Sequence, residues 1–190
     1  MPALVIVLRT VAVLAFAGVL LGVGARRGGH ETRARHRGGS RGPVAANLAA
    51  VGLYFFSLVT LSGSANGVTA LLMASSGSPL AVAGAALVLR SRAELGPAWS
   101  LVPKAGQETG LVTTGPYRWI RHPIYLGFAL LALGEALAFH NWLACSIALF
   151  GIVPTFAWRA RAEETLLSRT FGEGYGLYQR RTKLIFPYLL

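Results

Sequence analysis

Two groups of polar residues at the edges of apolar segments are the part of this chain best suited to chemistry. The first lies in residues 115–127, Gly-Pro-Tyr-Arg-Trp-Ile-Arg-His-Pro-Ile-Tyr-Leu-Gly, where an apolar run begins. The second is the pair Glu163 and Glu164, which follows a later apolar run. Charged groups are expensive to hold in or beside a bilayer, and they indicate function by default. Arginines, a histidine and two carboxylates in these places therefore predict a binding site for a polar ligand.

The composition is that of a membrane protein. Of the 190 residues, 54% are hydrophobic and 13% are charged, against about 25% charged in a typical soluble domain. The formal net charge is +11, but the basic residues lie between apolar runs and no nucleic-acid motif is present. We therefore predict anionic membrane lipids, and no nucleic acid, as partners. A single cysteine, Cys145, leaves no disulfide framework and no cysteine-based metal site, and we predict no metal.

A membrane-spanning helix needs about 20 apolar residues. The first apolar segment is predicted to be a retained transmembrane helix, because the charge-rich stretch follows it instead of preceding it as in a signal peptide. The third apolar segment, residues 67–92, is interrupted by small polar residues and by Pro79. We interpret it as one helix ending near Arg92, with a shorter helix from Pro79 as the alternative. The expected spans are 3–25, 43–62, 67–92, 122–139 and 141–158.

The last two spans are separated by only His140 and Asn141, which predicts a tight antiparallel hairpin. Five spans also satisfy the positive-inside rule, because 17 of the 18 lysines and arginines then fall on one side of the membrane and only Arg9 does not. We predict a single all-α membrane domain, 1–190, with its N-terminus outside and its C-terminus cytoplasmic, in a bacterial-type inner membrane. The expected cytoplasmic segments are 26–42, 93–121 and 159–190.

Each polar residue also has a simpler interpretation when it is taken alone. His122 precedes Pro123, and a residue before such a proline can cap a helix. The arginines can anchor the chain at the interface, and the two glutamates can balance neighbouring arginines on a solvated helix. Glu135 differs because it lies in the middle of a span, where structural pairing and a role on a substrate path are both open.

The complete set is more specific than its parts. The residues occur in this order: Gly115-Pro116-Tyr117-Arg118, Arg121-His122-Pro123, Tyr125 and Gly127, then Glu163-Glu164 with Leu167, then Phe171-Gly172, Tyr175, Tyr178, Arg181 and Pro187. This pattern resembles the isoprenylcysteine carboxyl methyltransferase and phospholipid methyltransferase family of integral membrane enzymes. The resemblance runs from about Gly84 to Pro187.

The resemblance implies S-adenosylmethionine as methyl donor and a lipophilic or prenylated acceptor that arrives from the bilayer. It also implies a cofactor pocket formed on the cytoplasmic side by residues 115–127 and the helical tail. In this interpretation Arg121 and Arg181 orient a carboxylate acceptor, and Glu163 accepts the proton of an amine acceptor. The expected cofactor-binding residues are Gly115, Pro116, Tyr117, Arg118, His122, Pro123, Tyr125, Glu164, Tyr175 and Tyr178.

Other interpretations stay open at this point. Two acceptors stay open, an isoprenylcysteine-like carboxylate and a phospholipid-like amine, and so does the oligomeric state. A non-catalytic basic scaffold that binds anionic lipid would explain the arginines but leave His122 and the glutamate pair without a role. A related NADPH-dependent membrane reductase would need about ten spans, more than this chain provides.

Overall fold

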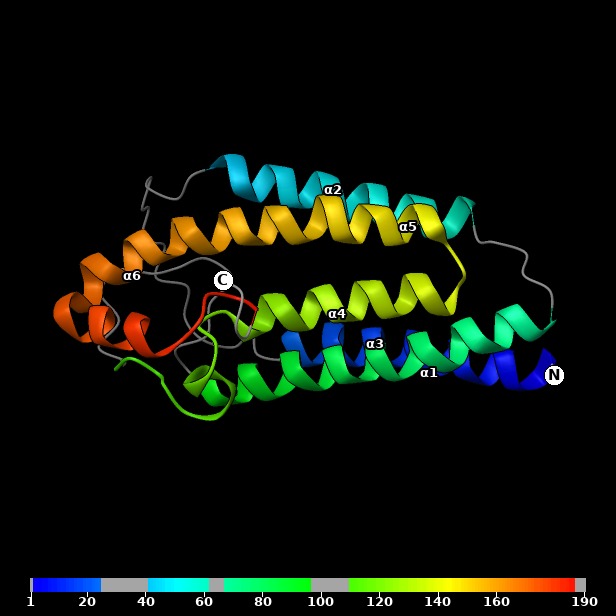
Figure 1. Ribbon diagram of the computed structural model, residues 1–190, viewed down its shortest axis with the longest axis horizontal. Coiled ribbons are helices and arrows are strands. Elements are labelled where there is room, and N and C mark those ends of the chain that lie inside the picture. The colour runs from blue at the N-terminus through cyan, green and yellow to red at the C-terminus, as the bar shows by residue number, and fades with distance from the viewer. Residues whose placement is uncertain (1, 25–40, 62–66, 97–109, 187–190) are drawn as a thin grey trace.

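The protein is a bundle of long helices (Figure 1). The computed structural model describes residues 2–24, 41–61, 67–96 and 110–186. Within these residues the only bridge between extended segments joins Ile120 to Lys183. This confirms the predicted all-α class. The helices are α1 (Pro2–Gly24), α2 (Arg41–Thr60), α3 (Gly67–Leu95), the short η2 (Gly115–Arg118), α4 (Pro123–Ala138), α5 (Trp142–Ile147), η3 (Ala148–Ile152) and α6 (Val153–Arg181).

Four of the helical stretches are long and apolar enough to cross a membrane, and α4 is a shorter apolar helix. Side chains such as Val59 and Phe150 are 83% and 80% exposed on the outside of the bundle, as expected of a lipid-facing surface. The chain is therefore a multi-pass integral membrane protein. Residues 26–40 of the predicted segment 26–42, residues 97–109 of the segment 93–121 and the motif residue Pro187 lie outside the described residues.

The fifth span does not end where its apolar part ends. Helices α5, η3 and α6 run on as one stretch from Trp142, and the part from Trp142 to Phe171, before the kink at Gly172, spans about 45 Å at the α-helical rise. The hydrocarbon core of a bilayer is about 30 Å thick, so we place the charged part from Arg159 onward beyond the membrane. Figure 1 shows this rod beside α2, whereas α1 and α3 lie on the other side of α4.

Helices α3 and α4 pack with their backbones in contact, and glycines make this possible. Gly77 and Gly84 on α3 face Gly134 and Gly127 on α4. A Cβ atom built on Gly84 would lie 2.5 Å from the amide nitrogen of Leu131, closer than any real contact. Small residues that let helices approach closely are a common device in membranes. The α3–α4 pair is thus the rigid base on which the start of α4 is held.

Arg9, the one cation outside the predicted cytoplasmic side, has structural partners. Its Nε atom donates to the carbonyl oxygen of Ala138 at 3.0 Å, and its guanidinium lies over the ring of Phe139. The last carbonyls of a helix have no partner within the helix and favour a positive charge. Arg9 therefore caps the C-terminal end of α4.

The predicted hairpin between the last two spans is present. Asn141 caps α5 by accepting a hydrogen bond from the amide of Ala144 at 2.8 Å. Its side-chain nitrogen also donates to the carbonyl of Ser57 on α2 at 2.8 Å. The turn is consequently fixed to a third helix as well as to the two helices it joins.

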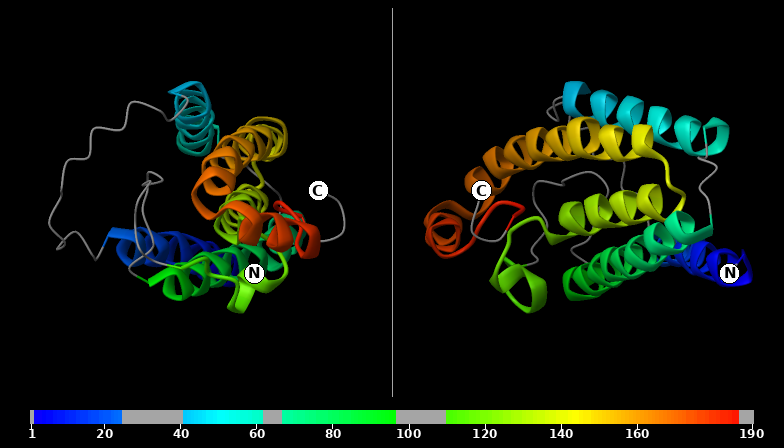
Figure 2. Two further views of the ribbon diagram at one scale, coloured as in Figure 1. Left: turned by 90° about the vertical axis from the view of Figure 1, so that its left-hand side faces the viewer. Right: turned by 45° about the vertical axis from the view of Figure 1, so that its right-hand side comes forward.

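Helix α6 reverses direction near its end, and this reversal brings the C-terminal segment back to the bundle. Gly172 has φ 54° and ψ −130°, a conformation open essentially to glycine alone. After it the chain returns to the start of α4 (Figure 2). There the amides of Arg121 and His122 donate to the carbonyls of Lys183 and Leu184 at 2.8 and 2.9 Å.

Candidate functional site

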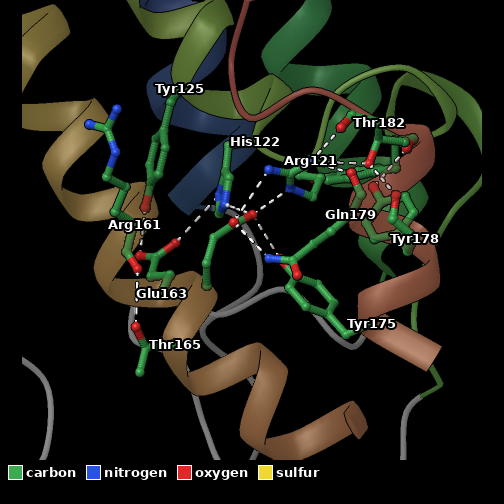
Figure 3. A network of polar contacts seen from close by, with 12 residues as sticks. Arg121, His122, Tyr125, Arg161, Glu163, Thr165, Tyr175, Tyr178, Gln179 and Thr182 are labelled. Atoms are coloured by element: carbon green, nitrogen blue, oxygen red, sulfur yellow. Dashed lines mark hydrogen bonds and ion pairs between the residues drawn. The ribbon is translucent and has the colours of Figure 1, made fainter. Parts of the chain in front are cut away.

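Polar side chains from three segments meet where α4 begins, and we call them the polar cluster. Arg121 and His122 come from the turn into α4, Glu163 and Glu164 from the middle of α6, and Tyr175 from the part of α6 beyond Gly172. Figure 3 shows His122 between Arg121 and Glu163, with Tyr175 below them. The structure thus places His122 beside both glutamates of the pair.

Glu164 accepts hydrogen bonds from every side of the polar cluster. Arg121 donates through Nε at 2.5 Å and Nη2 at 3.3 Å. The hydroxyl of Tyr175 donates at 3.0 Å and the amide nitrogen of Gln179 at 2.9 Å. Burial acts to raise the pKa of the Glu164 carboxyl group, but the nearby His122 and Arg121 outweigh it and lower that pKa to about 2. Glu164 is thus a fixed anion at neutral pH.

Arg121 joins the start of α4 to the returning tail. Besides its two bonds to Glu164, its Nη1 atom donates to the carbonyl oxygens of Gln179 at 3.2 Å and Thr182 at 2.5 Å. A guanidinium has five N–H groups in a planar fork, and these contacts engage all three of its nitrogens. The geometry therefore gives Arg121 a positioning role, although it also lines the cavity described below.

Glu163 has a different environment from its neighbour. It accepts a hydrogen bond from the hydroxyl of Tyr125 at 2.6 Å and another from Nε of Arg159 at 3.0 Å. Arg159 lies one helical turn earlier on α6, and its guanidinium sits over the Tyr125 ring at 5.7 Å. Glu163, Arg159 and Tyr125 all line the cavity, so a carboxyl group and a guanidinium group are presented to it together.

His122 is buried, with 8% of its surface exposed. It occupies the capping position of α4, but its imidazole makes no capping hydrogen bond. Its Nδ1 and Nε2 atoms lie 3.7 and 3.6 Å from Glu163 and Glu164, beyond hydrogen-bond distance. Nε2 has no hydrogen-bond partner among the described residues. The ring instead stacks on Tyr125, which stacks in turn on Phe156.

A single cavity of about 540 Å³ extends from the polar cluster into the bundle. Its polar end is lined by Arg121, His122, Arg159, Glu163 and Tyr175. Its other end lies between helices that cross the membrane and is mostly apolar. The residues there include Phe16 and Leu20 of α1, Asn47, Val51, Tyr54 and Phe55 of α2, Val88 of α3, Phe128, Leu131, Ala132 and Glu135 of α4, and Ile152 and Phe156 of η3 and α6.

The predicted site residues divide into two groups. Some line the cavity: Tyr117, Arg121, His122, Tyr125, Glu163, Tyr175 and Tyr178. The others do not line it: Gly115, Pro116, Arg118, Pro123, Glu164 and Arg181.

Most residues of the second group have an evident structural part. Gly115 has φ +56°, and a Cβ atom on it would meet the side chain of Glu94. Pro123 is buried in the first turn of α4, whereas Arg118 is exposed and lies over the ring of Trp119. Arg181 is exposed at the end of α6, so the structure does not bring it to the polar cluster.

Sequence reasoning did not single out several residues that line the cavity. Arg159 carried a readable signal, because it precedes Glu163 by four residues, the spacing of a helical ion pair. Tyr54, Phe16 and Phe55 carried none, since they lie in helices outside the motif. Only tertiary packing places them against α4.

A family model described as phospholipid methyltransferase matches residues 71–174, more than half of the chain. The chain belongs to the phospholipid methyltransferase family. The match includes the turn into α4, the glutamate pair and Gly172, and it confirms the resemblance inferred from the motifs.

Curated relatives match about half of the chain. It is 35% identical over 96 residues to protein-S-isoprenylcysteine O-methyltransferase of Saccharomyces cerevisiae, which covers 50% of this chain and 40% of that protein. It is 38% identical over 103 residues to the nickel-cobalt-cadmium resistance protein NccN of Alcaligenes xylosoxydans xylosoxydans, covering 51% of this chain and 46% of that protein. The chain thus spans less than half the length of these relatives.

The fold also matches a solved structure, that of the eukaryotic intramembrane Ras methyltransferase, isoprenylcysteine carboxyl methyltransferase. The TM-score is 0.61 at 18% identity, over 93% of this chain and 63% of that one. Because this match includes α1 and α2, the shared fold extends beyond the segment in which the sequences are similar.

Proposed function

We propose that this protein transfers a methyl group from S-adenosylmethionine to a lipophilic acceptor that resides in the membrane. The observation that carries this proposal is the single cavity that joins the polar cluster to an apolar channel between α1, α2, α4 and α6. A soluble, charged donor suits the first end and a membrane-embedded acceptor suits the second. Family membership and the named methyltransferases among the relatives support the same reaction class.

The side chains at the polar end suit S-adenosylmethionine, which carries a carboxylate, an ammonium group, ribose hydroxyls and a sulfonium cation. His122 has a buried ring nitrogen without a hydrogen-bond partner, a suitable donor for the carboxylate when protonated. Glu163 is a suitable acceptor for the ammonium or the hydroxyls, and the Tyr175 ring offers an aromatic face to a cation. When bound, this group supplies an electrophilic methyl.

The chain's own residues would align the two reactants and exclude water, the main levers in an in-line displacement. The stacked rings of Tyr125 and Phe156 border the cavity where its polar lining gives way to apolar side chains. Arg159 lines that region and suits a carboxylate acceptor, whereas Glu163 suits an amine acceptor as the group that takes its proton. The lining therefore accommodates either acceptor chemistry.

The role predicted for Arg181 can be compared directly with that of Arg159. We expect Arg159→Ala to lower methylation of a carboxylate acceptor at least tenfold, because it removes a cation from the cavity wall. We expect Arg181→Ala to leave it within about twofold, because that side chain is exposed and lies off the cavity. Methylation of a prenylcysteine carboxylate and of a phosphatidylethanolamine amine, measured with both variants, would also separate the two acceptor classes.

We further propose that the polar cluster lies on the cytoplasmic side, because the charge bias of the sequence places the tail there. In a Cys145→Ala background, Ser168→Cys puts one exposed thiol on the charged part of α6. A membrane-impermeant maleimide should label it only after the cells are permeabilised. Labelling of intact cells would reverse the orientation.

Binding of S-adenosylhomocysteine to the purified protein in detergent, measured by calorimetry with NADPH in parallel, tests the proposed cofactor. We expect micromolar affinity for the first ligand and none for the second. His122→Ala should weaken that affinity at least tenfold, whereas Ser168→Ala, an exposed substitution on the same helix as the glutamates, should not. Folded protein that binds neither ligand would remove the proposal in favour of a lipid-binding scaffold, and binding of NADPH alone would favour a reductase.

A further inference from the structure

One acidic side chain lies in the apolar part of the cavity. Glu135 is on α4, twelve residues after Pro123, which is about 18 Å along the helix axis. Only 4% of its surface is exposed, yet it lines the cavity. Its neighbours in the lining include Val51, Leu131 and Ile152. An acid is costly in such surroundings and indicates a function by default.

The hydrogen-bonding capacity of the Glu135 carboxyl group is only partly met by the described residues. Its one side-chain partner among the described residues is Tyr54, whose Oη atom lies 3.5 Å from Oε2. The same hydroxyl is 2.7 Å from the carbonyl oxygen of Ala132. A tyrosine hydroxyl has a single proton, and the shorter contact takes it. The Glu135 carboxyl group therefore receives no full hydrogen bond from Tyr54.

The hydrogen-bonding capacity left at Glu135 limits which ligands can fill the inner end of the cavity. An unbranched or branched hydrocarbon chain reaching Glu135 would exclude water from a carboxyl group that has no donor, which carries a free-energy penalty. A chain that carries a hydroxyl group at that depth would supply the missing donor. Sites built to hydrogen-bond a ligand group discriminate strongly against analogues that lack it.

We propose that Glu135 and Tyr54 form a second polar subsite that binds a hydroxyl group on the hydrocarbon part of the acceptor. This inference rests on the proposed function only because it identifies the bound molecule as the methyl acceptor. The acceptor class is then a hydroxylated lipid, with its methylated group at the polar cluster and its hydroxyl about 18 Å further in. Glu135 acts as a specificity determinant and takes no part in methyl transfer.

A matched pair of probes tests the subsite. Hexadecanoate and 16-hydroxyhexadecanoate differ only in a hydroxyl group at the far end of the chain. Their dissociation constants are measured calorimetrically for the wild type, Glu135→Gln and Glu135→Leu in the same detergent. Each probe partitions into the detergent micelles to the same extent in all three samples. The ratio of the two dissociation constants, compared between variants, therefore isolates the contribution of residue 135.

We expect the preference for the hydroxylated probe to be about tenfold larger in the wild type than in Glu135→Leu. This factor corresponds to the contribution of one hydrogen bond in a buried site. Glu135→Gln should keep most of that preference, because its side-chain oxygen still accepts a hydrogen bond. If leucine prevents folding, Glu135→Met serves in its place. An equal ratio in all variants would overturn the proposal and leave Glu135 with a bound water only.

The same samples separate this inference from the proposed function. Glu135 is about 18 Å from the polar cluster along α4, so S-adenosylhomocysteine should bind the wild type and both variants with equal affinity. Absence of that binding, with the hydroxyl preference intact, would remove the cofactor assignment and leave the subsite. Normal binding with no hydroxyl preference would remove the subsite alone.

Discussion

Two glutamates, Glu164 beside the polar end of the cavity and Glu135 in the lining of its inner end, are in opposite situations. At the polar end Glu164 accepts hydrogen bonds from Arg121, Tyr175 and Gln179. At the inner end Glu135 has only a 3.5 Å contact with Tyr54. A carboxylate with all its donors holds parts of the protein together, whereas one without them is suited to receive a ligand. The comparison indicates that burial of an acid does not by itself identify a binding residue. The number of hydrogen bonds that the buried acid receives from the protein is the more informative property.

The glutamate pair shows a second contrast within two adjacent positions, namely which of the two side chains faces the cavity. Glu164 points to the returning tail and does not line the cavity, whereas Glu163 lines it beside Arg159. We infer that Glu164 is a positioning residue and that Glu163 contacts the ligand. Successive residues of a helix point about 100° apart, so neighbours in sequence face different surroundings.

The largest expected effect is at Glu164. Glu164→Gln removes the charge that compensates Arg121, and we expect it to lower the free energy of unfolding by about 3 kcal/mol, as when one partner of a buried ion pair is lost. The thermal unfolding temperature in detergent measures this. Glu173→Gln, an exposed position on the same helix, is the control and should change nothing. A Glu164→Gln protein as stable as the wild type would contradict the structural role given to Glu164 in contrast to Glu135.

A pH dependence follows from the same carboxyl group. Its pKa falls from an ordinary 4.5 to about 2 in the folded protein. The unfolded chain therefore binds the proton more tightly, and the stabilisation is complete above pH 4.5 and is lost as the pH falls toward 2. It is on the order of 3 kcal/mol. Unfolding followed from pH 6 to pH 2 should show this loss in the wild type and a flatter acid limb in Glu164→Gln.

The reversal of α6 is the next test, because it delivers Tyr175 and Gln179 to Glu164. Gly172→Ala places a side chain in a conformation that costs about 1–3 kcal/mol, and we expect both stability and S-adenosylhomocysteine affinity to fall. Gly174→Ala lies two residues further on, in regular helix with open space around it. That control should leave stability unchanged or raise it by up to about 1 kcal/mol. Equal behaviour of the two variants would contradict the role given to Gly172.

The smallest expected effect is at the inner end. Glu135→Leu replaces a carboxyl group that lacks donors with an apolar side chain in an apolar wall, so we expect stability within about 1 kcal/mol of the wild type, or above it. Thermal unfolding measures this alongside Glu164→Gln. A loss as large as that of Glu164→Gln would show that Glu135 holds helices together, and the contrast between the two ends would fail.

Much of the architecture was predictable because hydropathy and charge are local properties. The all-α membrane class and the tight hairpin at His140 and Asn141 follow from them. The third apolar segment forms one helix, as predicted, with Pro79 inside it. The length of α6 was not predicted, because a charged sequence beyond the membrane can continue a helix as easily as end it.

The candidate site was predictable where its residues belong to a compact motif. His122, Tyr125 and Glu163 were singled out, and they line the cavity. Arg181 belongs to the same motif but is exposed, because the direction of a side chain after a chain reversal depends on the angles at Gly172. Tyr54 was missed because it lies in α2, a helix whose sequence carries no part of the motif.

The sequence by itself determined the membrane class, the family and the residues of the polar cluster, since these depend on composition and on order along the chain. The tertiary structure alone decided which acid is satisfied and which is not. Donors reach Glu164 from the turn before α4 and from the reversed end of α6, whereas Tyr54 gives its one proton to Ala132 instead of Glu135. A count of hydrogen-bond donors is a property of three-dimensional packing, because the groups that form each bond are far apart in sequence.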